Sequence, residues 1–322
     1  MRVVINDAVF QSAPDFATLD RLIDHFISGR HLWEIDDVDM ILSSSWLTGN
    51  DRVTKRNVET LEKCFVANAQ QPSTRMHRIA IAVNLTTTAS NQLSTADALS
   101  SLATPVVVIV ENEESDGAFL AAIVRAFRRD AVEYAIHERW IELDHAGGYG
   151  EIEKRIERYK SRITGPQRVL VLTDSDRLFP GHQSQTYKKI VQVCTDHGVA
   201  CGILEKRSIE NYLPVGALQR SGRREQYKAY LHLSSSQKDH YRVKSGFSRD
   251  KNGACVVPSE QTALFAHVPA KILEDLCGGF GDETWRLFKS AGDVITKDTM
   301  ELTCQSNPCE LPDLLDQIEE LI

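Results

Sequence analysis

Short, continuous apolar runs alternate with amphipathic segments from residue 105 onward. The apolar runs predict strands at PVVVIVE (105–111), WIELDH (140–145), RVLVLT (168–173) and VACGILE (199–205). Helical spacing predicts helices over 115–130, with Ser115 or Asp116 as N-cap, over 151–163 and over 184–198, and a further helix starting at 208–214. Strands that are apolar at every position and alternate with helices are typical of a mainly parallel sheet covered on both faces. The pattern therefore predicts an α/β fold.

The chain on either side of this segment has a different pattern. Residues 1–100 predict a separate α-rich unit, with amphipathic helices over 15–29 and 50–69, a strand at 77–85 and a Ser/Thr-rich linker with a short helix over 86–101. Residues 254–322 predict an acidic helical region. The predicted organisation is thus an N-terminal region (1–100), an α/β domain (101–253) and a C-terminal region (254–322).

Composition narrows the functional classes. The 322 residues carry a net charge of −8, which argues against a general nucleic-acid coat protein. No apolar run approaches the roughly 20 residues of a membrane span, and the first residues lack the apolar core of a secretory signal, so we expect a cytoplasmic protein without a membrane partner. Seven scattered cysteines fit reduced thiols.

The charge is unevenly distributed. Residues 205–251 contain eleven Lys/Arg against five Asp/Glu, whereas residues 271–322 contain four against twelve. The basic stretch indicates either a localised contact with an anionic partner or a solvated helical face.

Acidic residues follow three of the predicted strands. Glu111 ends the first, with Glu113, Glu114 and Asp116 close behind; Asp174 and Asp176 follow the third; Glu205 and Glu210 follow the fourth. Ligands of parallel sheets bind beyond the carboxyl ends of the strands. Crowded carboxylates there indicate a divalent cation, Mg²⁺ or Mn²⁺, although an Asp at a strand end is also a common cap or turn residue.

Four segments resemble the Toprim domain of OLD-family nucleases, over about residues 105–250. They are VVVIVENEESDGAFL, VLVLTDSDR, ILEKRSIENYLP and HYRVKSGF. Asn112 stands where that family has Gly, and the spacing from Glu111 to Asp116 is one residue longer. Which of Glu111, Glu113 and Glu114 is the metal ligand therefore stays open, with Glu111 favoured because the apolar run ends there.

The resemblance implies phosphodiester hydrolysis of DNA or RNA with two Mg²⁺ or Mn²⁺ ions. We expect the carboxylates of Glu111, Asp174 and Asp176 to lie close enough to share a cation. The implied metal ligands are Glu111, Asp116, Asp174, Asp176 and Glu210, and the implied catalytic residues are Glu111, Asp174, Asp176 and Lys244. Nucleic acid would bind to the basic stretch, through Lys206, Arg207, Arg223, Arg224, Arg242 and Lys244. HAGGYG (145–150) would either approach a phosphate with its backbone or form a flexible turn.

The sequence has no G-x-x-x-x-G-K-[ST] phosphate loop, whereas OLD-family proteins usually carry an ABC-type ATPase. The chain is therefore similar to free-standing Toprim effectors of antiphage systems, which implies a separate ATPase partner docked on the N-terminal or C-terminal region. A homo-oligomer is also compatible with the sequence.

Two other interpretations are a non-catalytic Toprim module that binds nucleic acid or protein, and a receiver-like phosphotransfer domain.

Overall fold

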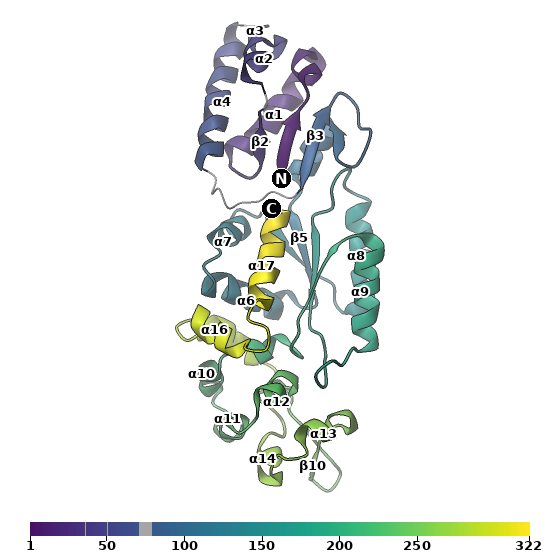
Figure 1. The fold of residues 1–322 in the computed structure, drawn as a ribbon, viewed down its shortest axis with the longest axis vertical. Coiled ribbons are helices and arrows are strands. Elements are labelled where there is room, and N and C mark those ends of the chain that lie inside the picture. Colours follow the sequence, from purple (N-terminus) through teal and green to yellow (C-terminus); the bar gives the residue numbers. More distant parts are fainter. Residues whose placement is uncertain (36, 50, 71–78) are drawn as a thin grey trace.

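The computed structural model describes residues 1–35, 37–49, 51–70 and 79–322. Two four-stranded parallel sheets, one following the other along the long axis, are flanked by helices, and a small antiparallel hairpin lies near the far end (Figure 1). We call the first the N-terminal sheet and the second the central sheet. The α/β fold with a parallel sheet is therefore confirmed.

The central sheet contains the four strands that the sequence predicts. Its order is β6-β5-β7-β8, and every neighbouring pair is parallel. The five residues of β5 and the five of β7 are all buried, as the unbroken apolar runs require. The strands are β5 (Val106–Val110), β6 (Ile141–His145), β7 (Val169–Thr173) and β8 (Ala200–Ile203).

Alternate residues of the central strands pack on opposite layers of helices. Val108 and Leu170 belong to the core beneath α6, α7 and α17, whereas Val107 and Val171 belong to the core beneath α8 and α9. Figure 1 shows these two groups of helices on the two sides of β5. The helices are α6 (Glu113–Ala126), α7 (Asp130–His137), α8 (Tyr149–Lys160), α9 (Gln185–His197) and α17 (Glu310–Leu321).

Residues 1–100 form an α/β unit, so the prediction of an α-rich region is incomplete. The N-terminal sheet has the order β2-β1-β3-β4 and is parallel throughout. Three of its strands escaped prediction because they are only three or four residues long, too short to show a period. The elements are β1 (Arg2–Ile5), α1 (Phe16–Ile27), β2 (Leu32–Glu34), α2 (Val38–Ser43), α3 (Ser45–Thr48), α4 (Asp51–Gln70), β3 (Ala80–Asn84), β4 (Gln92–Ser94) and α5 (Thr95–Ala103). The first residues of the predicted 77–85 strand lie outside the described residues.

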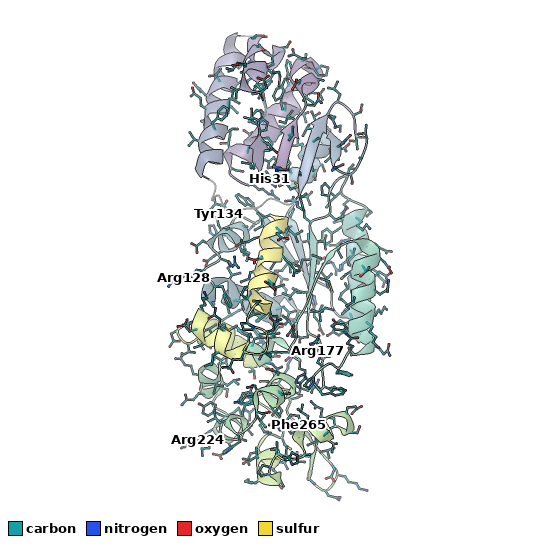
Figure 2. The ribbon with its side chains drawn as sticks, viewed as in Figure 1. His31, Arg128, Tyr134, Arg177, Arg224 and Phe265 are labelled. Carbon is teal, nitrogen blue, oxygen red and sulfur yellow. The ribbon has the colours of Figure 1, made fainter. Side chains whose placement is uncertain are left out.

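The carboxyl end of α5 joins the two sheets. The guanidinium of Arg30 donates to the carbonyl oxygens of Ala103 and Thr104, and that of Arg168 donates to those of Ser101 and Thr104. Buried His31 contacts the Leu102 carbonyl at 3.0 Å, and Figure 2 shows it at the junction. Cations stabilise the negative end of a helix dipole. Because Arg168 precedes β7, the N-terminal unit meets the central sheet at the amino ends of its strands.

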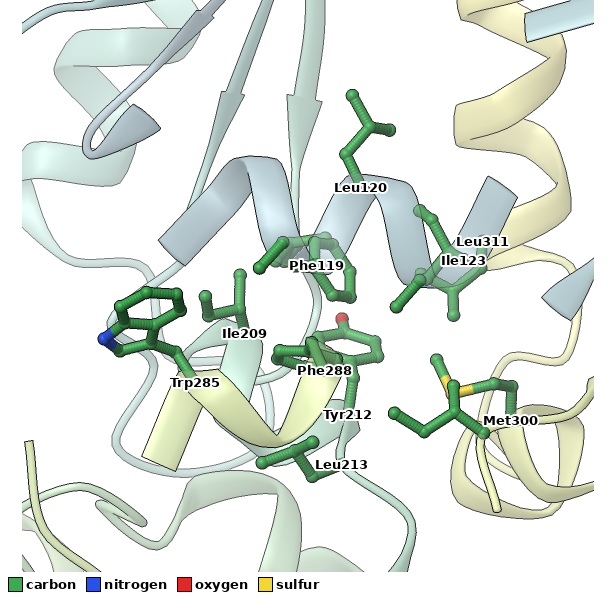
Figure 3. Close-up of a cluster of buried hydrophobic side chains, with 14 of the residues drawn as sticks. Phe119, Leu120, Ile123, Ile209, Tyr212, Leu213, Trp285, Phe288, Met300 and Leu311 are labelled. Carbon is green, nitrogen blue, oxygen red and sulfur yellow. The ribbon is translucent and has the colours of Figure 1, made fainter. Parts of the chain in front are cut away.

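Residues 254–322 share one hydrophobic core with the central sheet. Phe288 packs edge-on against Phe119 of α6, with ring centroids 5.4 Å apart, and Tyr212 lies 5.4 Å from the same ring. Met300 and Leu311 close this cluster (Figure 3). The predicted boundary at residue 253 is therefore not a boundary in the packing of the core.

Short elements complete the chain: α15 and α16 pack against α6, and the others extend beyond the carboxyl ends of the central sheet (Figure 1). They are η3 (Ile209–Tyr212), α10 (Val215–Leu218), α11 (Arg224–Leu231), α12 (Ser235–His240), β9 (Ser248–Arg249), β10 (Cys255–Val256), α13 (Thr262–Phe265), α14 (Ala270–Asp275), α15 (Leu287–Ser290) and α16 (Lys297–Thr303). In the part of the chain that the structure describes, none of the helices has the length and apolar character needed to cross a membrane.

The shared core predicts that the C-terminal helix is required for folding. Leu315 of α17 is fully buried, so Leu315→Ala should lower the free energy of unfolding by about 2–5 kcal/mol. Leu302→Ala, on α16 with 66% of the side chain exposed, should change it by less than about 0.5 kcal/mol. Urea denaturation followed by circular dichroism measures both. Equal, small effects would show that α17 does not stabilise the core.

Candidate active site

A cavity of about 530 Å³ opens at the carboxyl ends of the central strands. All five predicted metal ligands line it: Glu111 follows β5, Asp116 lies in α6, Asp174 and Asp176 follow β7, and Glu210 lies in η3. The remaining lining residues are Asn112, Ser115, His145, Gly147, Gly148, Tyr149, Arg207, Ser208, Ile209, Arg242 and Lys244. The parallel topology explains this convergence, because β5, β7 and β8 are neighbours and end at one edge.

Glu111 and Asp116 are placed by the cap of α6. The N-cap is Asn112, not Ser115 or Asp116 as predicted, because its Oδ1 accepts from the backbone N–H groups of Glu114 and Ser115. Asp116 Oδ2 in turn accepts from Asn112 N–H at 2.9 Å. This cap leaves Glu113 and Glu114 exposed and outside the cavity lining, so of the three alternatives only Glu111 lines it.

Asp174 is the cavity acid on which all four of the other acids act. Burial raises its pKa well above the ordinary value, and the charges of Glu210, Asp116, Asp176 and Glu111 raise it further. Among the described residues, one hydrogen-bond donor compensates the carboxylate: the N–H of Ile209 donates to Oδ1 at 2.9 Å. The arrangement favours either a proton or a cation at this position.

Burial raises the pKa of Asp116 as well, to about 6, and the Glu111 charge adds to the effect. Hydrogen bonds from Asn112, Ser115 and Glu111 act in the opposite direction without cancelling it. Two acids of the cavity thus have pKa values above their usual range.

Asp176 has a left-handed backbone conformation, with φ of +52°, that is uncommon for a residue other than glycine. Its N–H donates to the carbonyl of Arg207 at 3.0 Å, which ties the loop after β7 to the loop after β8. The hydroxyl of Tyr149 donates to Asp176 Oδ2 at 3.2 Å. Burial, together with the charge of Asp176, raises the pKa of Tyr149, so this hydroxyl stays protonated.

The Glu-Asn-Tyr segment forms the short helix η3. Ser208 and Asn211 make a capping box, and Ser208 Oγ donates to Glu210 Oε2 at 2.7 Å. Asn211 Nδ2 donates to the carbonyls of Lys238 and Tyr241. Tyr212 is fully buried in the core described above. The segment therefore positions Glu210, which is 5% exposed, at the wall of the cavity.

Three of the six predicted nucleic-acid contacts line the cavity: Arg207, Arg242 and Lys244. Burial, together with the charge of Arg242, lowers the pKa of Arg207, so the two cations lie close and favour an anion between them. Arg223 and Arg224 are exposed but do not line the cavity.

The assignment of Lys206 to nucleic-acid binding is wrong. Its side chain is 4% exposed, and its Nζ pairs with Asp239 and donates to the carbonyl of Thr303 at 2.8 Å. A lysine that is buried and paired in this way is held inside the fold by its partners and is not available to nucleic acid.

A close crossing of two glycines holds the loop that carries Arg242 and Lys244. Gly246 and Gly279 both have positive φ, of +62° and +56°. A Cβ on Gly279 would lie 2.5 Å from Gly246 N and Val243 O and 2.6 Å from Lys244 O. Gly281 N–H donates to the Lys244 carbonyl at 2.8 Å. The C-terminal region thus places Lys244 beside the acids.

The sequence analysis singled out HAGGYG (145–150) for its backbone alone and did not predict the side chains of His145 and Tyr149 as part of this cavity. His145 ends β6, whose register pairs it with Val110, so it lies beside the residue that precedes Glu111. The signal was present, because WIELDH ends in a polar residue like the other strands. Ser115, Tyr149 and Ser208 also line the cavity and were not proposed.

The carboxylates surround the cavity instead of meeting at one point, which corrects the expectation of a compact shared cluster. Within the described ranges, the only three acidic or histidine donors with ligand atoms within 4.8 Å of one another are the surface residues Glu153, Glu157 and His197. Mg²⁺ usually keeps several waters and takes one or two carboxylates together with substrate phosphates. Acids spread around a cavity with room for a phosphate and for water fit that mode of binding.

Comparisons of this chain with family models, curated proteins and solved structures found no match.

The glycine crossing gives a matched pair of variants. Gly278 and Gly279 both have positive φ, but a Cβ on Gly278 meets nothing within 4 Å. Gly278→Ala should lower the free energy of unfolding by about 1–2 kcal/mol, because only backbone strain is added. Gly279→Ala should lose about 1–3 kcal/mol more from the collision. Urea denaturation distinguishes them, and equal losses would show that the crossing is not tight.

The raised pKa values predict how stability depends on pH in metal-free protein. A carboxyl whose pKa rises on folding favours folding below its unfolded pKa, and this contribution is lost as the pH rises through the folded value. For Asp116, with a shift from 3.8 to about 6, the loss is about 3 kcal/mol. The lowered pKa values of His25, His31 and His240 act in the opposite direction between pH 5 and pH 8, so the contribution of the cavity is measured by comparing variants by urea denaturation in EDTA.

Asp174→Asn should reduce the loss of stability that the cavity acids cause between pH 5 and pH 8, because it removes a repelling charge. Glu113→Gln, on the exposed first turn of α6, should leave that loss unchanged. The same loss in all three proteins would contradict the electrostatic description of the cavity.

Proposed function

We propose that this chain is a Mg²⁺- or Mn²⁺-dependent nuclease that hydrolyses phosphodiester bonds of DNA or RNA. One observation carries the proposal: five carboxylates from neighbouring strand ends face a single cavity that also has a cationic side. The acids favour metal, and Arg207, Arg242 and Lys244 favour phosphate. A cavity that offers both suits a substrate which is itself a metal-bound phosphate.

The proposed ligands are Glu111, Asp116, Asp174, Asp176 and Glu210. Divalent cations bound there would activate water and neutralise charge on the leaving oxygen. Asp174 is central to this set, because all four other acids raise its pKa. Glu210 and Asp116 are oriented by the hydroxyls of Ser208 and Ser115 and by the backbone N–H of Asn112.

Lys244 and Arg242 would act on the substrate. Both are exposed at the cavity rim, and neither side chain has an ion pair or hydrogen bond with another described residue, so they can contact a phosphate. Lys244 is the proposed donor to the phosphate oxygen on which charge develops. Arg223 lies near Lys244, since its guanidinium lies 3.7 Å from a Cβ built on Gly281, and Gly281 N–H donates to the Lys244 carbonyl. Arg224 is the next residue along the chain. Both arginines would guide the strand toward the cavity, and binding should weaken as salt increases.

A separate ABC-type ATPase partner remains part of the proposal, because the chain has no phosphate loop of its own. The N-terminal unit meets the central sheet at the strand ends opposite the cavity. A partner docked on that unit would leave the cavity open to nucleic acid. A homo-oligomer would be compatible with the same arrangement.

Cleavage of plasmid DNA and of total RNA with Mg²⁺, Mn²⁺ or EDTA tests the function. Activity should require metal. Asp174→Ala should reduce the rate of cleavage by orders of magnitude, because a central metal ligand is lost. Lys244→Ala should retain metal binding but reduce turnover about 100-fold. Glu111→Gln should be inactive while the matched Glu113→Gln stays active, since only Glu111 lines the cavity.

Two outcomes would contradict the proposal. If Asp174→Ala unfolds the protein in EDTA, the acid stabilises the fold. If the wild-type chain binds nucleic acid but never cleaves it with either metal, the chain is a binding module.

A further inference from the structure

The segment HAGGYG connects β6 to α8 and places one phenol at the acidic cavity. Gly147 and Gly148 have φ of +73° and +125°, conformations that side chains rarely adopt, and Tyr149 follows as the first residue of α8. The ring of Tyr149 stands between two cavities, the acidic one and a second of about 300 Å³ between α8 and α9. The two glycines thus turn the chain so that the hydroxyl faces the acids.

The partner of this hydroxyl is the Asp176 carboxylate, at 3.2 Å. Among the described residues it is the one hydrogen-bond donor to that carboxylate. The backbone of Asp176 is held in its left-handed conformation by the bond to the Arg207 carbonyl. The backbone hydrogen bond fixes the position of the Asp176 Cα atom, and the hydrogen bond from Tyr149 orients the carboxylate oxygens.

We propose that Tyr149 is a positioning residue that orients the Asp176 carboxylate for a divalent cation, an inference that rests on the proposed metal-dependent function. A carboxylate that binds metal is commonly oriented by a hydrogen bond from a neighbouring group. A neutral phenol suits this role because a lysine or arginine in its place would neutralise Asp176 and compete with the cation. One oxygen of Asp176 accepts from Tyr149, and the other stays available.

Thermal unfolding at increasing Mg²⁺ concentration tests this without any assay of cleavage. Metal that binds the folded state raises the melting temperature. The reference is the Mg²⁺ concentration that gives half of the rise in melting temperature of the wild-type protein, called the Mg²⁺ midpoint. Tyr149→Phe should need about tenfold more Mg²⁺ for the same rise in melting temperature. The matched control is Tyr159→Phe, on the same helix, whose hydroxyl contacts the exposed Arg158 instead. It should match the wild type.

A double-variant cycle separates positioning from a general effect on folding. With Asp176→Asn already present, adding Tyr149→Phe should shift the Mg²⁺ midpoint no further. A further tenfold shift would mean that Tyr149 acts through another group, and an unchanged midpoint in Tyr149→Phe alone would overturn the inference while leaving the metal site intact. A wild-type chain that does not respond to Mg²⁺ or Mn²⁺ would overturn both this inference and the proposed function.

Discussion

Repulsion among carboxylates at one edge of the central sheet is the constraint on which the rest of this structure depends. Parallel strands end together, and the five cavity acids follow three of them: Glu111 and Asp116 come after β5, Asp174 and Asp176 after β7, and Glu210 after β8. The pKa of Asp174 is raised by all four of its acidic neighbours. Folding without a compensating cation therefore places like charges together at a free-energy cost, and the surrounding contacts must be strong enough to hold them.

Those contacts come largely from the C-terminal part of the chain. The hydroxyl of Tyr212, the residue after the Glu-Asn pair, is bonded to Glu310, at the start of α17, and accepts from Lys206 N–H. The glycine crossing holds the Lys244 loop against residues 278–281. The helices of residues 254–322, which the sequence predicts as a separate region, thus hold the acidic edge in place, and they share one hydrophobic core with the central sheet.

The sequence predicted well what depends on local pattern. Unbroken apolar runs such as VVVIV located the central strands, and the parallel rule then brought Glu111 and Asp174 to one edge. Prediction from sequence failed where short segments depend on tertiary context. Three strands of the N-terminal sheet are too short to show a hydrophobic period. Lys206 looked like its basic neighbours, because nothing local shows that Asp239, 33 residues away, buries it in an ion pair. Tyr149 was missed because its partner is 27 residues distant.

Anomalous diffraction from crystals soaked in Mn²⁺ tests the central claim most directly, because it locates the cation without relying on activity. We expect a peak in the cavity at the carboxyl ends of β5 and β7, within about 2.5 Å of oxygens of Asp174 and of at least one other of the five acids. A peak found only at the surface group Glu153, Glu157 and His197, with none beside Asp174, would contradict it.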